Sequence, residues 1–130
     1  MTAINRFEDI KAWQLARVLC KQIHGFTLKP AFSKDYRLIG QIKGSSGSIM
    51  DNIAEGFERN GNREFIQFLS IAKGSCGETR SQLYRALDNE YITQEEFNQL
   101  FQIAEEGSKL ISGFMEYLNQ TEIKGAKFKK

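Results

Sequence analysis

Hydrophobic residues recur every three or four positions in four long stretches of the chain, which is the spacing of one face of an α-helix. The first stretch covers about residues 7–24, the third 63–88 and the fourth 93–119. Thr93 and Glu96 have the spacing of a capping box at the start of the fourth. Short connections between helices of similar length make neighbours antiparallel. The pattern therefore predicts an all-α, up-down-up-down four-helix bundle.

The second stretch, about residues 34–55, gives a weaker pattern because its middle is rich in glycine and serine. Each glycine costs a helix about 1 kcal/mol relative to alanine. The apolar positions on either side stay in phase, so we expect the helix to continue. Small residues here and in the third stretch predict a close contact between the two helices: Gly44, Ser45, Gly47, Ser48, Ala72, Gly74 and Ser75.

The ends of the helices and the core can also be assigned from residue type. Gly25 is expected to end the first helix, since glycine is a common helix stop. The side-chain oxygen of Asn62 is expected to cap the third helix. Aromatic residues at helical spacing are expected in the core: Phe65, Phe68, Phe97, Phe101 and Phe114.

The 130 residues suffice for one domain with a hydrophobic core. We assign residues 1–120 to the bundle and 121–130 to a basic tail that we expect to be disordered. No apolar run is long enough to span a bilayer and the start does not resemble a signal peptide, so we expect a cytoplasmic protein without membrane contact. Cys20 and Cys76 are then expected to be buried thiols.

The net charge of +2 is unevenly distributed. Residues 1–60 carry nine Lys and Arg against six Asp and Glu, whereas residues 93–120 carry one against five. The last ten residues are basic again, with four against one. An acidic segment between basic regions can serve either self-association or binding of an anionic partner.

Candidate catalytic chemistry is sparse. The chain has a single histidine, His24, and no Cys-x-x-Cys pair, so no metal site is expected. The glycine-rich stretch lacks the Gly-Lys-Ser/Thr end of a phosphate-binding loop. Glu55 and Glu78 are better explained by salt bridges than by acid–base catalysis. We therefore expect neither enzyme activity nor a cofactor.

Five basic residues are the candidate contacts for a nucleic acid. Lys34, Arg37 and Lys43 are predicted on roughly one side of the second helix, and Arg59 and Arg63 around the following turn. Lysine and arginine along one face can neutralise phosphates and release counterions. The alternative, a solvated helix face with no partner, remains open.

Several motifs together resemble a known family. They are Asn-Ile-Ala-Glu-Gly at residues 52–56, Ile-Ala-Lys-Gly-Ser at 71–75, and Trp13 near the start. This arrangement is similar to that of bacterial S23-like proteins, whose genes lie in intervening sequences of large-subunit ribosomal RNA genes. The chain departs from that pattern where Lys43 and Gly44 replace a frequent basic pair.

The resemblance implies a four-helix bundle, a ring-like homopentamer and no enzyme activity. A related branch comprises basic accessory proteins of diversity-generating retroelements, which associate with RNA and a reverse transcriptase. We therefore predict a non-catalytic, homo-oligomeric accessory protein that binds RNA or another nucleic acid through the five basic residues. The alternative is a protein–protein assembly module, in which the acidic fourth helix faces a basic surface of a partner.

Overall fold

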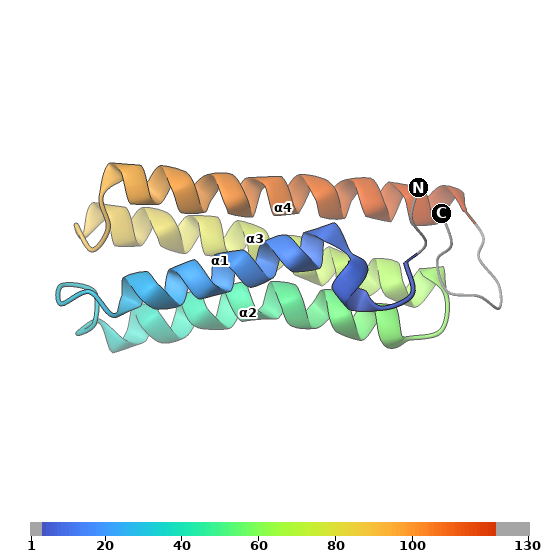
Figure 1. Cartoon of the computed structure of the whole chain (residues 1–130), viewed down its shortest axis with the longest axis horizontal. Helices are drawn as coiled ribbons and strands as arrows, with labels where there is room; N and C mark the ends of the chain where they lie inside the picture. Colours follow the sequence, from blue (N-terminus) through green and yellow to red (C-terminus); the bar gives the residue numbers. More distant parts are fainter. Residues whose placement is uncertain (1–3, 122–130) are drawn as a thin grey trace.

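The computed structural model describes residues 4–121, which form a short 3-10 turn and four long helices. The turn η1 covers Phe7–Asp9, and helix α1 covers Lys11–Thr27. Helix α2 covers Tyr36–Glu58, α3 covers Asn62–Asp88 and α4 covers Gln94–Gln120. The four helices lie side by side along one long axis, which confirms the predicted all-α fold (Figure 1). All but the first residue of the predicted basic tail lies outside the described range.

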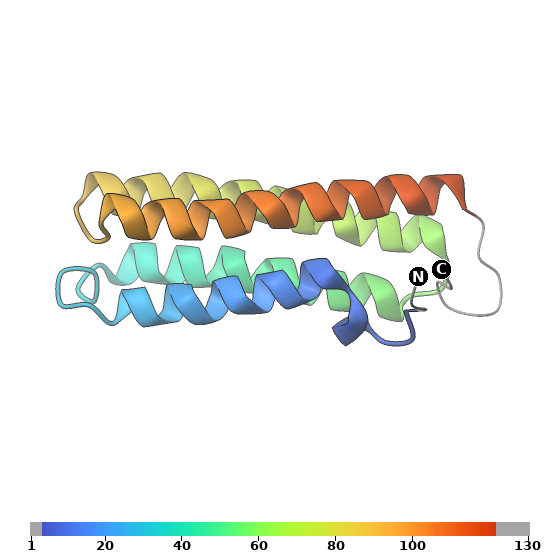
Figure 2. The same ribbon diagram turned by 45° about the horizontal axis from the view of Figure 1, so that its top comes forward.

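Each helix packs against two others. Helix α2 contacts α1 and α3, and α4 contacts α3 and α1, so that α2 and α4 lie diagonally opposite. The contact between α2 and α3 is the most extensive, and that between α1 and α4 is the least. Successive helices run in opposite directions, as the predicted topology requires (Figure 2).

The beginning and end of α1 differ from the prediction. Ile10 has an extended backbone, with φ −79° and ψ 122°, and it separates η1 from α1. Gly25 does not end the helix, which continues to Thr27. The Thr27 hydroxyl then donates to the carbonyl of His24 at 2.7 Å. The apolar contacts of Phe26 and Thr27 therefore outweigh the helix-breaking tendency of one glycine.

The N-termini of the other helices show one confirmed and one wrong prediction. Thr93 and Glu96 form the predicted capping box of α4, with reciprocal hydrogen bonds of 3.1 and 2.9 Å. Asn62, in contrast, does not cap α3 through its oxygen. Its side-chain amide instead donates to the carbonyl of Leu118 at 2.9 Å, which joins the start of α3 to the end of α4.

The glycine-serine stretch is helical, as predicted, and its serines form a buried polar seam between α2 and α3. The Ser45 hydroxyl lies 2.8 Å from the hydroxyl of Thr79 and donates to Gln82 at 2.6 Å. The Ser75 hydroxyl donates to Ser48 at 2.9 Å. These hydrogen bonds satisfy polar groups that would be costly to bury alone.

The glycines of this region do not take part in that contact. A Cβ atom built on Gly44, Gly47 or Gly74 would have no neighbouring atom within 4 Å, so all three face open space and their predicted packing role is wrong. The close approach occurs instead at Gly56, which is buried. A Cβ there would lie 2.7 Å from Cβ of Phe68 and 2.8 Å from the ring of Phe65.

The core is built largely from the expected residues. Phe65 and Phe97 are buried, and Phe101 and Phe114 are partly buried against the core. Phe68, also predicted for the core, is half-buried. Cys76 is buried and Cys20 is half-buried. Burial raises the pKa of the Cys76 thiol to about 11, which keeps it protonated at neutral pH.

Candidate nucleic-acid interface

The five predicted basic residues do not form one cluster. Lys34 precedes α2, and Arg37 lies in its first turn. Arg59 follows the last residue of α2, and Arg63 lies in the first turn of α3. Arg37 and Arg59 are 22 residues apart, which corresponds to about 33 Å along a helix. The structure therefore divides the set between the two ends of the bundle.

The geometry of α2 also separates Lys43 from its predicted neighbours. Lys34 lies outside α2, so helical spacing does not give its angular position around the helix axis. Arg37 and Lys43 are six residues apart, which turns the helix by about 600° and places them about 120° apart around its axis. The prediction that these three lie on one side of α2 is therefore wrong.

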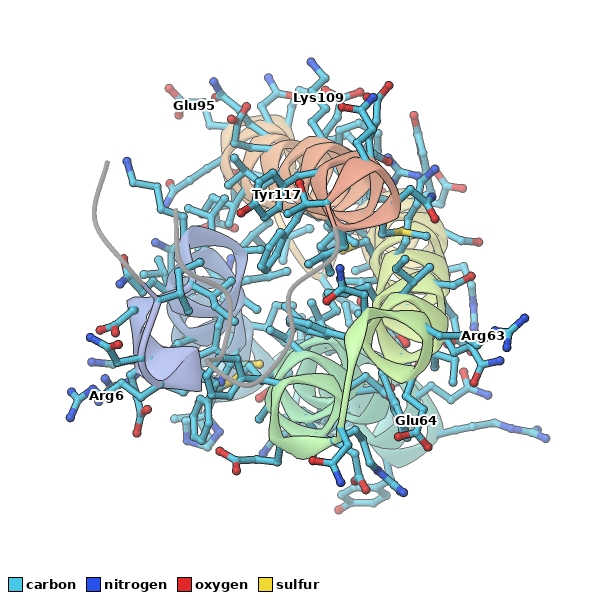
Figure 3. The ribbon with its side chains drawn as sticks, turned by 90° about the vertical axis from the view of Figure 1, so that its right-hand side faces the viewer. Arg6, Arg63, Glu64, Glu95, Lys109 and Tyr117 are labelled. Carbon is cyan, nitrogen blue, oxygen red and sulfur yellow. The ribbon has the colours of Figure 1, made fainter. Side chains whose placement is uncertain are left out.

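Arg59 and Arg63 lie close in sequence but have different surroundings. The Arg59 guanidinium pairs with the Glu55 carboxylate at 2.8 Å and lies over the ring of Phe68 at 5.0 Å. Its charge is therefore partly balanced within the chain, and the predicted salt bridge of Glu55 is confirmed. Arg63 is exposed and points away from the bundle (Figure 3).

At the opposite end, acidic residues accompany the cations. Asp35 caps α2 by accepting from the amide of Leu38 at 3.0 Å, and it also accepts from the Tyr91 hydroxyl at 2.9 Å. These two hydrogen bonds, assisted by the charges of Arg85 and Arg37, hold the pKa of the Asp35 carboxyl below its usual value. Lys34 and Arg37 thus lie beside an ionised carboxylate.

A second group of basic residues lies along α1. Arg17, Lys21 and His24 are all exposed, and spacings of four and three residues put them on one helix face. Lys43 of α2 joins this group, because its ammonium donates to Nδ1 of His24 at 3.1 Å. We call these four residues the α1 strip.

The α1 strip has no acidic neighbour on its own helix. No Asp or Glu occurs between Asp9 and Asp35, a segment that contains Arg17 and Lys21. Arg17 lies over the Trp13 ring at 5.9 Å. The sequence shows this acid-free segment directly. The charge count over residues 1–60 hides it, because that count also includes carboxylates outside the segment.

The outer face of α4 has the opposite charge. Exposed carboxylates gather there against the single cation Lys109: Glu95, Glu105, Glu106 and Glu116. Glu95 and Lys109 extend outward on the side of the bundle opposite α2 (Figure 3). An ion pair of 2.7 Å between Lys29 and Glu96 joins the basic and acidic regions. The outer face of α4 is thus acidic, in contrast to the α1 strip.

One pocket is largely apolar, whereas another, on α2, is lined mostly by charged residues: Asp51, Ala54, Glu55, Glu58 and Arg59. A cavity of about 580 Å³ lies between α1 and α4, and its lining is largely apolar. Ile10, Leu110, Phe114 and Tyr117 form part of its wall. Within residues 4–121, no three His, Cys, Asp or Glu side chains are close enough to hold a metal ion. No helix in the same range is long and apolar enough to cross a membrane.

The fold and its motifs define a class of small, all-helical bundle proteins, and comparison with known proteins gives the family. The model of the 23S rRNA-intervening sequence protein family matches residues 8–113, so this chain belongs to that family. This confirms the resemblance carried by residues 52–56 and 71–75.

A solved structure supports the same assignment. It is a protein of unknown function from the S23 ribosomal protein family of Bacteroides thetaiotaomicron VPI-5482. The two share 25% sequence identity with a TM-score of 0.75, and the match covers 81% of this chain and 98% of the other. A comparison with curated proteins finds no match.

Proposed function

We propose that this protein is a non-catalytic accessory protein that self-associates and binds RNA through the α1 strip. The observation that carries the proposal is that Arg17, Lys21 and His24 share one face of a helix without a single carboxylate, and that Lys43 extends this face from α2. Such a surface can attract a phosphate backbone. The family's name refers to 23S rRNA, which makes structured RNA the first ligand to test.

Self-association supplies the affinity that one copy lacks. The net charge of one chain is only +2, and its strip offers three permanent cations and a histidine. A weak site gains strongly in effective affinity when several copies engage one RNA molecule. Five copies in a ring, as the resemblance implies, would present five strips at once.

The roles of the five basic residues predicted from sequence then differ. Lys43 belongs to the strip. Lys34 and Arg37 lie at the start of α2 beside the Asp35 carboxylate, and Arg37 is turned away from Lys43, so in this proposal they are not part of the strip. Arg59 and Arg63 lie at the far end of the bundle. In this proposal they contribute only to the long-range electrostatic attraction of the protein for RNA.

The test is fluorescence anisotropy of a structured RNA titrated with the full chain at several salt concentrations. Binding should be micromolar or tighter at low salt and should weaken steeply as salt rises. Lys21→Glu should reduce the affinity at least tenfold. Arg63→Glu, an equal charge change at an exposed site outside the strip, is the matched control and should reduce it much less.

Two results would overturn the proposal. One is equal loss in the Lys21→Glu and Arg63→Glu proteins, which would leave the strip without a special role. The other is no RNA binding at low salt by a correctly folded oligomer. In that case the acidic face of α4 favours the protein–protein assembly module. Recovery of a single protein partner after nuclease treatment would then support that alternative.

A further inference from the structure

Tyr36 differs from the other tyrosines of the chain in having no partner for its ring. Tyr84, Tyr91 and Tyr117 each contact another aromatic ring. Within residues 4–121, the ring of Tyr36 makes no such contact and its hydroxyl makes no hydrogen bond. The residue is 81% exposed, the largest fraction among the exposed hydrophobic residues. Packing within one chain therefore does not explain an aromatic side chain at this position.

The backbone that carries this exposed ring is nevertheless held in place. Tyr36 is the first residue of α2, directly after the capping residue Asp35. One carboxylate oxygen of Asp35 accepts from the Leu38 amide at 3.0 Å, and the other accepts from the Tyr91 hydroxyl at 2.9 Å. A tyrosine side chain has only two χ angles, so ordering it in a complex costs little entropy. The ring is thus a rigid apolar surface presented to the solvent.

Tyr36 shares a face of α2 with a member of the α1 strip. Tyr36 and Lys43 are seven residues apart, which is within about 20° of two full turns and about 10 Å along the helix axis. Gly40 lies between them, and a Cβ atom there would have no neighbour within 4 Å, so no side chain separates the two. Since Lys43 contacts His24 of α1, Tyr36 lies just beyond the end of the strip.

The strip and the ring follow one line on the surface. Helices α1 and α2 run in opposite directions, so the direction from Arg17 to His24 along α1 is also the direction from Lys43 to Tyr36 along α2 (Figure 2). Proteins that bind single-stranded nucleic acid combine cations that follow the phosphates with aromatic rings that stack on bases. The α1 strip followed by Tyr36 has this combination.

We propose that Tyr36 stacks on an unpaired base of the RNA whose phosphates lie along the α1 strip. The inference rests on the proposed function and specifies its ligand, which is an RNA with unpaired nucleotides and not a continuous duplex. In a duplex the base faces cover one another, whereas bases in loops and bulges can be splayed out onto an aromatic side chain. An uncharged base, unlike a phosphate, is not repelled by the neighbouring Asp35 carboxylate.

The first test compares two RNAs by fluorescence anisotropy with the full chain. One is a hairpin with an unpaired loop, and the other is a blunt, fully paired duplex. The unmodified protein should bind the hairpin more tightly. Tyr36→Ala should lower the hairpin affinity about tenfold and leave the duplex affinity nearly unchanged. Tyr36→Phe keeps the ring and should bind normally. Ile71→Ala, at a 53% exposed apolar site on α3, is the matched control and should bind normally too.

A second test detects the stack directly. The fluorescent base 2-aminopurine, placed at each loop position of the hairpin in turn, loses emission when it stacks on a ring. The unmodified and Tyr36→Phe proteins should quench it at one position, whereas Tyr36→Leu, which is apolar but has no ring, should not. Tyr36→Ala removes no charge, so it should leave the slope of log Kobs against log salt unchanged. Circular dichroism of each variant verifies that it is folded.

The outcomes separate this inference from the proposed function. If the unmodified protein binds no RNA at low salt, both are wrong. If Lys21→Glu weakens hairpin binding and Tyr36→Ala does not, the strip binds RNA and only the stacking site is overturned. The stacking site is also overturned by equal losses on hairpin and duplex, by a Tyr36→Phe protein as weak as Tyr36→Ala, or by absence of quenching at every loop position.

Discussion

The Tyr91 hydroxyl donates a 2.9 Å hydrogen bond to the Asp35 carboxylate, and thereby joins the α3–α4 connection to the residue that caps α2. Tyr91 also stacks on Phe32 with ring centroids 5.0 Å apart, and Phe32 is buried. Two loops that are 56 residues apart in sequence are therefore held together at one end of the bundle. This end should depend on the charge of Asp35.

The first prediction concerns acid stability. Hydrogen bonds lower the pKa of Asp35, and the bond from Lys29 is the main cause of a lowered pKa of Glu96. A carboxyl group whose pKa is lower in the folded state stabilises the fold at pH values above its unfolded-state pKa. It loses that contribution as the pH falls through its folded-state pKa. The melting temperature should therefore fall below about pH 4.

Tyr91→Phe provides the test of that link. It removes the hydrogen bond and retains the ring, so it should lower the melting temperature at neutral pH. The difference from the unmodified protein should shrink as Asp35 becomes protonated. Thermal unfolding followed by circular dichroism from neutral to strongly acidic pH measures both effects. A difference that stays constant across this range would show that Asp35 ionisation is not involved.

The second prediction concerns Gly56. Gly56→Ala introduces a Cβ that meets Phe68 at 2.7 Å and Phe65 at 2.8 Å, so α2 and α3 must separate slightly. Overpacking of this kind costs about 1–3 kcal/mol. Gly74→Ala is the matched control in open space, and it should stabilise the protein by about 0.5–1 kcal/mol. Urea denaturation gives both values, and equal effects would disprove the close approach.

The third prediction concerns the polar seam. Ser75 is 6% exposed, and its hydroxyl donates to Ser48 at 2.9 Å. Ser75→Leu should overfill the contact between α2 and α3 and destabilise the fold by about 1–3 kcal/mol. Ser70→Leu, on the exposed side of α3, should change stability by less than about 0.5 kcal/mol. A melting temperature unaffected by Ser75→Leu would contradict tight packing at this seam.

The fourth prediction concerns the salt dependence of RNA binding. If Lys21 contacts a phosphate, its loss should reduce the slope of log Kobs against log salt by about one. Lys21→Gln removes the charge without adding a repulsive one, which makes it the appropriate variant for this measurement. Lys73→Gln should leave the slope unchanged. Parallel slopes for all three proteins would place the phosphate contacts elsewhere.

Most of the fold could be predicted from the sequence because helical periodicity is a local property. The pattern around Leu38 and Ile53 correctly extends α2 through its glycines, and Thr93 with Glu96 marks the start of α4. The predictions for Gly25 and Asn62 are wrong because the roles of these residues depend on tertiary partners. Burial of Thr27 carries α1 past Gly25, and Asn62 binds a carbonyl 56 residues away.

The candidate site was harder to predict, because a surface is formed by residues from different helices. The sequence identifies Lys43, but its neighbours Arg17 and Lys21 belong to α1, and only the packing of α1 on α2 brings them together. The pairing of Arg59 with Glu55, in contrast, follows from their i,i+4 spacing. The acid-free segment from residue 10 to 34 was the available signal for the α1 strip.

Gly56 also fixes how far α2 and α3 can slide along one another. The gap opposite Phe68 admits a hydrogen atom and no side chain. Asn52 and Ile53 lie one turn before Gly56 on the same side of α2, so a shift by one turn would bring one of them to this gap, and both are far too large for it. The same shift would separate Ser48 from Ser75. A single missing methyl group thus sets the axial register of the two helices that share the largest contact in the bundle.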